Sequence, residues 1–235
     1  MLGHAKFGCS HVHGTQDLFA ALAHSCNVYF FHVGLMIGPE YATQYGRAFG
    51  LGRPTGIDLP FESRGKLARP SGARGGWYKG NTLNLSIGQG ETLATPLQIA
   101  VMMGAAATDG FIFRPRLLKA VDGKPVPDVN LKRLPRVRLR DDVWQNVREA
   151  LRRTITDPEG TAHELADVQN IKVWGKTGTA QSGENKPNHA WFAGWARSDK
   201  ANIVFCVFLE HGGSSANAVI LTRDLLLRMQ AQGII

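Results

Sequence analysis

The stretch Ile171-Lys-Val-Trp-Gly-Lys-Thr-Gly-Thr-Ala180 is the first of three closely spaced segments that predict a β-sheet. Ala190–Ala196 follows it after a polar loop, and Asn202–Leu209 is a third run rich in Val, Ile and Phe. The short connections between the three segments are typical of antiparallel neighbours. We therefore expect a three-stranded antiparallel sheet in the C-terminal part of the chain.

Helical patterns lie on both sides of this predicted sheet. The ranges with helical spacing of apolar residues are 17–23, 28–36, 39–48, 95–110, 141–155 and 216–230. Thr95 and Gln98 form a predicted capping box around Pro96, which suits a first helical turn. The Gly- and Pro-rich range 50–90 predicts a long, ordered loop, because apolar residues keep recurring in it. The expected class is α+β, with an antiparallel sheet flanked by helices.

The composition is that of a folded globular chain. Of 235 residues, 43% are hydrophobic and 9% aromatic, which excludes a disordered or collagen-like protein. Three cysteines are too few for a disulfide scaffold. No apolar run approaches the roughly 20 residues that span a bilayer, and the first ten residues hold no apolar stretch of signal-peptide length.

The net charge of +8 is concentrated in one part of the chain. The range 114–153 holds twelve Lys or Arg and five Asp or Glu, and its densest part is 131–140. One interpretation is a patch for an anionic partner, and the other is a solvated ribbon with Val137 and Leu139 turned inward. No aromatic residue separates the arginines of the densest part, so we expect no nucleic-acid binding.

Two short motifs combine residues suited to acyl transfer at a peptide carboxyl end. They are Ser25-Cys26-Asn27, between two helical stretches, and Lys176-Thr177-Gly178-Thr179, on the first predicted strand. A Lys ammonium beside two hydroxyls can bind a carboxylate, and Gly178 leaves room for a substrate backbone along the strand. A Ser hydroxyl can pass a proton, and an Asn amide can hold a carbonyl. Taken singly, the Ser-x-Asn motif is better explained as a helix N-cap, and the Lys-Thr-Gly motif as a strand-to-turn connection; together, in this order, they are far more specific.

Six motifs, in their order along the chain, resemble those of the class B penicillin-binding proteins. They are Ser25–Phe31, Phe49–Pro60, Leu85–Gly90, Thr95–Gln98, Gly175–Ala180 and His189–Gly194. Within that family, the sequence is most similar to the penicillin-binding protein 2 group of cell-elongation transpeptidases. The resemblance runs from about Gly14 to the C-terminus and implies the transpeptidase fold shared by penicillin-binding proteins and β-lactamases.

In that family a serine attacks the penultimate D-Ala carbonyl of a peptidoglycan stem peptide, and an amine of a second stem completes the cross-link. Penicillins mimic the D-Ala-D-Ala end and trap the acyl-enzyme. The resemblance implies catalytic roles for Ser25, Asn27 and Lys176, and binding of the substrate carboxylate and backbone by Thr177, Gly178 and Thr179. The N–H of Thr179 would supply half of an oxyanion hole. The reaction needs no cofactor.

The family's nucleophile lies in a Ser-x-x-Lys motif several tens of residues before Ser-x-Asn, and the 24 residues before Ser25 contain no such motif. The single match, Ser63-Arg-Gly-Lys66, follows a Pro-containing loop and holds a Gly, so it does not predict the helical turn that the contact requires. We therefore expect 1–235 to be a partial transpeptidase domain whose N-terminal part is missing. The chain alone is expected to be inactive.

For the intact protein, the resemblance implies a place at the periplasmic face of the cytoplasmic membrane, held by an N-terminal anchor that this chain lacks. The implied partners are peptidoglycan stem peptides, β-lactams and a glycosyltransferase of the elongation machinery.

Cys9, His11 and His13 alternate along the chain, and Cys26 follows thirteen residues after His13. Cys and His at such spacings can bind zinc. By resemblance, His13 and Cys26 align with zinc ligands of the penicillin-binding protein 2 group. One of the usual Asp partners would fall near Phe7, which cannot ligate, and Cys9 or His11 would substitute. The expected structural zinc site is Cys9, His13 and Cys26; the alternative is a small buried thiol beside a His-containing terminus.

Two other functions fit parts of the sequence. In a serine β-lactamase-like hydrolase, Glu62 would act as the deacylating base, although Lys66 stands where an Asn is expected. A non-catalytic binding module of the elongation machinery would use the same surface without a nucleophile.

Overall fold

The computed structural model describes residues 7–9, 11–72, 75–126, 135–183 and 185–235. Its centre is the predicted antiparallel sheet, in the order β3-β4-β5. The strands are β3 (Lys172–Ala180), β4 (His189–Arg197) and β5 (Asn202–Leu209). The register places Gly178 opposite Trp191, and Trp191 opposite Phe208. The expected α+β class with a C-terminal antiparallel sheet is confirmed.

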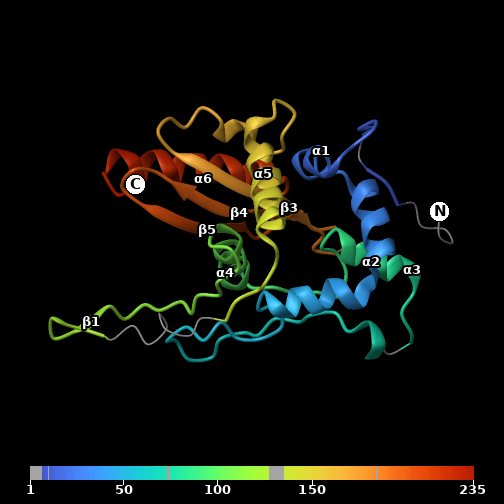
Figure 1. The fold of residues 1–235 in the computed structure, drawn as a ribbon, viewed down its shortest axis with the longest axis horizontal. Coiled ribbons are helices and arrows are strands. Elements are labelled where there is room, and N and C mark those ends of the chain that lie inside the picture. The colour runs from blue at the N-terminus through green and yellow to red at the C-terminus, as the bar shows by residue number, and fades with distance from the viewer. Residues whose placement is uncertain (1–6, 10, 73–74, 127–134, 184) are drawn as a thin grey trace.

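Helices cover both faces of this sheet (Figure 1). Helix α6 (Ser215–Ala231) lies along one face, while α4 (Pro96–Ala107) and α5 (Asp141–Thr156) pack against the other side. The predicted capping box is present at α4, because Thr95 Oγ1 accepts from Gln98 N–H and Gln98 Oε1 accepts from Thr95 N–H.

The two faces bury two separate apolar cores. Between α6 and the sheet, the side chains of Phe192, Val173 and Val219 are inaccessible to solvent. On the opposite face, Trp144 of α5 and Trp195 of β4 are the largest buried side chains. Side chains of β4 therefore point into both cores, as expected when successive residues of a strand face opposite sides of a sheet that is covered on both faces.

Three helices lie beside the free edge of β3 (Figure 1): α1 (Leu18–Ala23), α2 (Asn27–Ala48) and α3 (Lys79–Ser86). Helix α2 is broken at Gly38, which has φ 79° and ψ 158°, so the predicted separation of two helical ranges before Pro39 is confirmed. Among the described residues, no helix has both the length and the apolar composition required to cross a bilayer.

Helix α3 corrects the expectation that 50–90 is loop throughout. Its sequence contains Gly80 and two Asn, so its apolar periodicity is weak. The helix forms because it packs on α2, where a Cβ at Gly34 would lie only 1.8 Å from Ser86 Oγ. Tertiary packing thus stabilises a helix that its local sequence does not predict.

Residues 114–126, the first part of the basic range, form an extended ribbon that projects from the body (Figure 1). Val137 is buried and Leu139 half-buried, whereas Arg136 and Arg138 are exposed, as the solvated-ribbon interpretation expects. Part of the densest charge, 131–134, lies outside the described residues. The remaining short elements are β1 (Ala120–Val121), β2 (Lys124–Pro125) and the 3₁₀ turns Pro70–Gly72 and His163–Leu165.

Candidate active site

Ser25 lies at the end of α1 in a conformation that most residues avoid. Its φ of 57° is in the left-handed region. The N–H of Ser25 donates to Leu22 O (3.3 Å) and the N–H of Cys26 donates to Ala21 O (2.8 Å). These two bonds form a Schellman motif, whose left-handed position is usually glycine. The motif fixes the Ser25 hydroxyl, which is exposed, at the junction of α1 and α2.

Lys176 of β3 meets this hydroxyl. Lys176 Nζ donates to Ser25 Oγ at 2.8 Å, and it also lies 3.2 Å from Thr177 Oγ1 and 3.3 Å from Thr177 O. Burial lowers the pKa of the Lys176 ammonium from 10.5 to about 8. The residues of the two predicted motifs, 151 positions apart in sequence, therefore form one hydrogen-bonded group.

Thr177 and Thr161 hold this group in place. Thr177 is buried, and its Oγ1 donates to Thr161 Oγ1 at 2.8 Å. The N–H of Thr161 in turn donates to Ala23 O of α1 at 3.1 Å. The contact between Ser25 and Lys176 is thus braced through the segment that joins α5 to β3.

The outer edge of β3 is covered at one end and open beside Lys176. Arg152 and Thr154 of α5 donate to the carbonyls of Val173 (2.7 Å) and Gly175 (2.8 Å). Further along, Gln89 Nε2 donates to Thr179 O at 2.9 Å. Because both backbone groups of a strand residue point to the same side, the N–H of Thr179 also faces away from β4.

Ser25, Gln89 and Thr161 lie at one groove of about 590 Å³. Lys176, Thr177, Gly178 and Thr179 form one wall, and Asn27 lies on another. The Asn27 Nδ2 group donates to Gly8 O at 3.1 Å. The groove thus combines an ammonium, hydroxyls and a free strand edge, which suits an extended peptide with a terminal carboxylate.

The three predicted metal ligands lie together at the same groove. The ligand atoms of Cys9, His13 and Cys26 all lie within 4.8 Å of one another, and the two sulfurs are 3.7 Å apart. Two thiolates on a tetrahedral zinc ion are separated by about 3.8 Å, given Zn–S bonds of about 2.3 Å. Both ring nitrogens of His13 are buried without a hydrogen-bond partner among the described residues. The donor set therefore fits zinc.

The environment disfavours charge on these ligands when no metal balances it. Burial lowers the pKa of His13, and the neighbouring His11 and His24 lower it further. Burial also raises the pKa of the Cys26 thiol.

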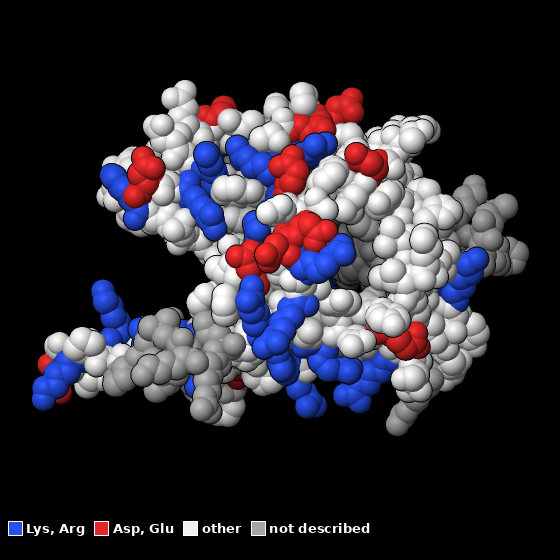
Figure 2. All heavy atoms as spheres, in the orientation of Figure 1, with Lys and Arg blue, Asp and Glu red and all other residues white. Residues whose placement is uncertain are grey.

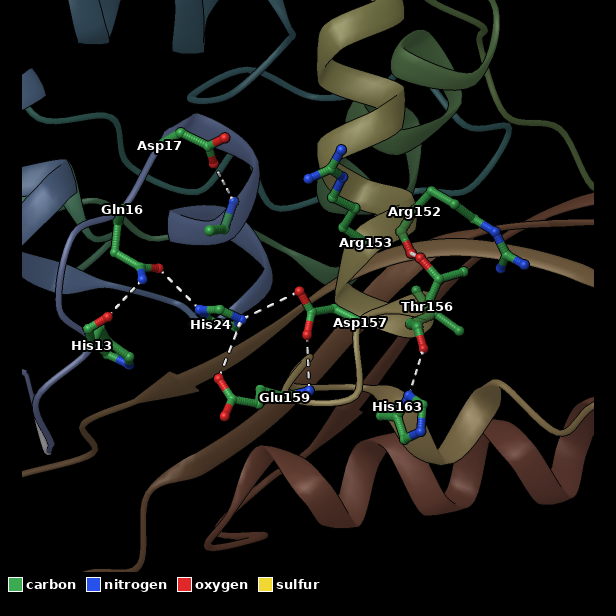
Figure 3. A network of polar contacts seen from close by, with 12 residues as sticks. His13, Gln16, Asp17, His24, Arg152, Arg153, Thr156, Asp157, Glu159 and His163 are labelled. Carbon is green, nitrogen blue, oxygen red and sulfur yellow. Dashed lines mark hydrogen bonds and ion pairs between the residues drawn. The ribbon is translucent and has the colours of Figure 1, made fainter.

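His24 joins the segment that carries His13 to the body of the domain (Figure 3). Its Nδ1 donates to Gln16 Oε1 at 2.9 Å, and Gln16 Nε2 donates to His13 O at 2.7 Å. On its other side, His24 Nε2 lies 3.4 Å from Asp157 Oδ2 and 3.9 Å from Glu159 Oε2. The residue before Ser25 therefore ties α1 to the loop after α5.

The Ser-x-x-Lys match lies away from this groove. Ser63 has no regular secondary structure and Lys66 forms a single β-bridge with Leu93, with Gly65 between them at φ 60°. Lys66 Nζ pairs with Glu91 at 3.0 Å. Burial alone would raise the pKa of Glu62, but hydrogen bonds from Thr55 and the backbone outweigh it and lower the pKa. Glu62 thus stabilises a loop, and its position does not support a deacylating role.

Sequence reasoning missed three residues of the site. Thr161 and His24 stand in segments without a recognisable motif, and only the fold brings them to Ser25 and Lys176. Gln89 lies in the Leu85–Gly90 motif quoted above, so a role for it was open to sequence analysis.

Comparison with known proteins identifies the family of this fold. The sequence profile described as "Penicillin binding protein transpeptidase domain" matches residues 2–226. The peptidoglycan D,D-transpeptidase MrdA of Haemophilus influenzae is 30% identical over 242 aligned positions, which cover 91% of this chain and 36% of that protein. The chain spans about a third of the length of the curated relatives that it matches.

Solved structures show the same fold. A chain of a peptidoglycan synthase complex that coordinates polymerization and crosslinking has a TM-score of 0.81 and 31% identity, covering 98% of this chain and 40% of that one. PBP2 of Helicobacter pylori, in complex with MreC, has a TM-score of 0.80 and 28% identity, covering 95% and 41%. The chain belongs to the penicillin-binding protein transpeptidase family, among relatives named MrdA or PBP2.

Proposed function

We propose that this chain forms the substrate-carboxylate half of a peptidoglycan D,D-transpeptidase site. The observation that carries the proposal is the hydrogen bond from Lys176 Nζ to Ser25 Oγ, inside a groove next to the open part of β3. With a pKa of about 8, Lys176 exchanges protons readily near neutral pH. Ser25 then relays a proton, while Asn27 orients the substrate amide.

The strand residues have a separate role in this proposal. Thr177 and Thr179 bind the terminal carboxylate with Lys176, and Gly178 lets the substrate backbone approach β3. The outward N–H of Thr179 stabilises the oxyanion of the acyl intermediate.

The nucleophile is proposed to lie outside this sequence, in a Ser-x-x-Lys segment of the whole protein. Residues 1–235 are then a partial transpeptidase domain that does not acylate alone. The whole protein would act at the periplasmic face of the cytoplasmic membrane, on stem peptides and β-lactams. The relatives found in complexes with MreC and in a peptidoglycan synthase support partners in the elongation machinery, including a glycosyltransferase.

Carboxylate recognition can be tested on the chain as it stands. Titration with a peptide ending in D-Ala-D-Ala, followed by NMR, should shift the resonances of residues 176–179, and the C-terminally amidated peptide should bind at least about tenfold more weakly. Lys176→Met should abolish the preference for the free carboxylate. Lys172→Met, on the exposed start of the same strand, is the control. Equal binding of acid and amide would contradict the proposed role.

Covalent chemistry requires a second experiment. Incubation of the chain with a fluorescent penicillin should give no labelled band on a denaturing gel. Stoichiometric labelling that Ser25→Ala or Ser63→Ala removes would overturn the proposal that the nucleophile lies elsewhere.

We also propose that Cys9, His13 and Cys26 hold a structural zinc ion. When bound, zinc would fix the segment before α1 against the start of α2, which carries Asn27. Competition with a colorimetric chelator should show one zinc per chain. His13→Ala and Cys26→Ser should each weaken the zinc affinity by about tenfold or more, whereas Cys206→Ser on β5 should leave it unchanged. Unchanged affinity in both ligand variants would exclude this site.

A further inference from the structure

A second groove, of about 660 Å³, lies between the end of α2 and the loops that follow it. It shares no lining residue with the active-site groove. Its basic side chains are Arg47, Arg53, Arg64, Lys66 and Arg69, and its one acidic side chain is Glu91. Figure 2 shows Lys and Arg side chains gathered below the centre of the drawn face, over the second half of α2 and the loops beneath it.

The positive charge of this groove is largely uncompensated. Glu91 pairs with Lys66 at 3.0 Å. Across the described part of the chain, the four arginines of the groove have no carboxylate partner. Five basic groups and one acidic group leave a formal charge of +4 around one cavity. Such a concentration of like charge is unfavourable by itself and attracts a multivalent anion.

The backbone that carries these arginines is held in place. Gln98 is buried, and its Nε2 donates to the carbonyls of both Arg53 (2.7 Å) and Arg64 (2.9 Å). At Gly65, with φ 60°, an added Cβ would lie 2.3 Å from Leu93 O. The two loops are therefore closely packed, which reduces the entropy that a ligand must overcome.

We propose that this groove binds an oligophosphate, meaning two or more linked or adjacent phosphate groups. Arginine matches phosphate because its planar fork donates two parallel hydrogen bonds to phosphate oxygens. A single carboxylate carries one charge and a single phosphate about two, so neither neutralises +4. A cavity of this size holds several phosphate groups. The same chemistry is offered by a free oligophosphate and by phospholipid headgroups.

Calorimetric titration of the full chain with inorganic tripolyphosphate tests the proposal. We expect saturable one-to-one binding that weakens as salt is raised. Arg53→Gln and Arg64→Gln should each weaken binding about tenfold. Arg138→Gln, which removes the same charge from the exposed ribbon, should leave it unchanged. Circular dichroism melts show whether each groove variant folds like the wild type. If Arg53→Gln or Arg64→Gln does not, Arg69→Gln is used in its place.

Cosedimentation with phosphatidylcholine vesicles, with and without phosphatidylglycerol, separates the two sources. If the chain binds the anionic vesicles and tripolyphosphate displaces it from them, the natural ligand is a phospholipid headgroup. If the chain binds tripolyphosphate but not the vesicles, the ligand is a free oligophosphate. The proposal is overturned if tripolyphosphate does not bind, or if Arg138→Gln weakens binding as much as the groove variants.

Discussion

At the scale of single residues, the site depends on a serine in a conformation that favours glycine. Ser25 occupies the left-handed position of the Schellman motif after α1, and this position costs a non-glycine residue about 1 kcal/mol. Its hydroxyl compensates by accepting from Lys176. Serine at this position therefore serves the hydrogen bond with Lys176 rather than the stability of the turn after α1.

Two substitutions of Ser25 separate backbone strain from the side-chain contact. Both Ser25→Gly and Ser25→Ala remove the acceptor of Lys176, but only glycine relieves the left-handed strain. We expect the Gly variant to have a free energy of unfolding about 1 kcal/mol above that of the Ala variant. Urea denaturation measures the difference, and equal stabilities would show that the motif is not strained.

The lowered pKa of Lys176 predicts a pH dependence of stability. Below pH 8 the ammonium is charged in both states, so the full cost of burying it is present. Between about pH 8 and the ordinary pKa of 10.5, the unfolded chain binds more protons, so stability rises with pH.

Lys176→Met should remove this dependence. Its stability relative to the wild type should fall by up to roughly 3 kcal/mol between about pH 7 and about pH 10.5. Lys172→Met, the exposed neighbour on β3, should follow the wild type over the same range. Denaturant melts at both pH values give the comparison, and a parallel shift of the two variants would contradict the assignment.

At the scale of elements, the sheet requires the glycine at position 194 of β4 far more than the glycine at position 178 of β3. A Cβ at Gly194 of β4 would lie 1.9 Å from Trp174 O, which belongs to the neighbouring strand. A Cβ at Gly178 of β3 would lie 3.3 Å from Trp191 Cβ, which can shift slightly. The first glycine thus serves the pairing of β3 with β4, and the second leaves space in the groove.

Gly194→Ala should therefore destabilise the fold by about 3 kcal/mol or more, and Gly178→Ala by less than about 1 kcal/mol. Thermal melts of both variants test the contrast. In the peptide titration proposed above, Gly178→Ala should still weaken binding. A similar loss of stability in both variants would argue against the register described here.

At the scale of the whole molecule, the chain leaves large apolar side chains uncovered on one helix. Those of α2 are Val28, Leu35, Met36, Ile37, Tyr41 and Tyr45, and the side chain of Met36 is 85% exposed. Uncovered apolar surface of this kind promotes association.

We expect the chain to self-associate at micromolar concentration through this surface. Replacing Met36 and Tyr41 by Glu should shift the sedimentation profile toward monomer. Phe61→Glu, at an exposed loop position outside α2, should have little effect. A monomeric wild type, or equal rescue by the Phe61 variant, would contradict the prediction.

The order of elements could be predicted because their patterns are local. The runs at 171–180, 190–196 and 202–209 show strand composition, and Gly38-Pro39 breaks a helix wherever it occurs. Helix α3 could not be predicted, because contact with α2 stabilises it against its own composition. The short β1–β2 hairpin was not among the predicted elements, although Asp122-Gly123 between its strands, both at positive φ, is a hairpin turn signal.

The sequence by itself determined the antiparallel sheet, its flanking helices and the two motifs for which we propose catalytic and binding roles. Only the tertiary structure placed Lys176 Nζ within 2.8 Å of Ser25 Oγ, with Thr161 and His24 around them. It also gathered four arginines at a second groove, where none pairs with a carboxylate among the described residues. The physical reason is the distance along the sequence over which each effect acts. Periodicity and capping act over a few residues, whereas these contacts join segments tens to more than a hundred residues apart, which only the packing of helices on the sheet brings together.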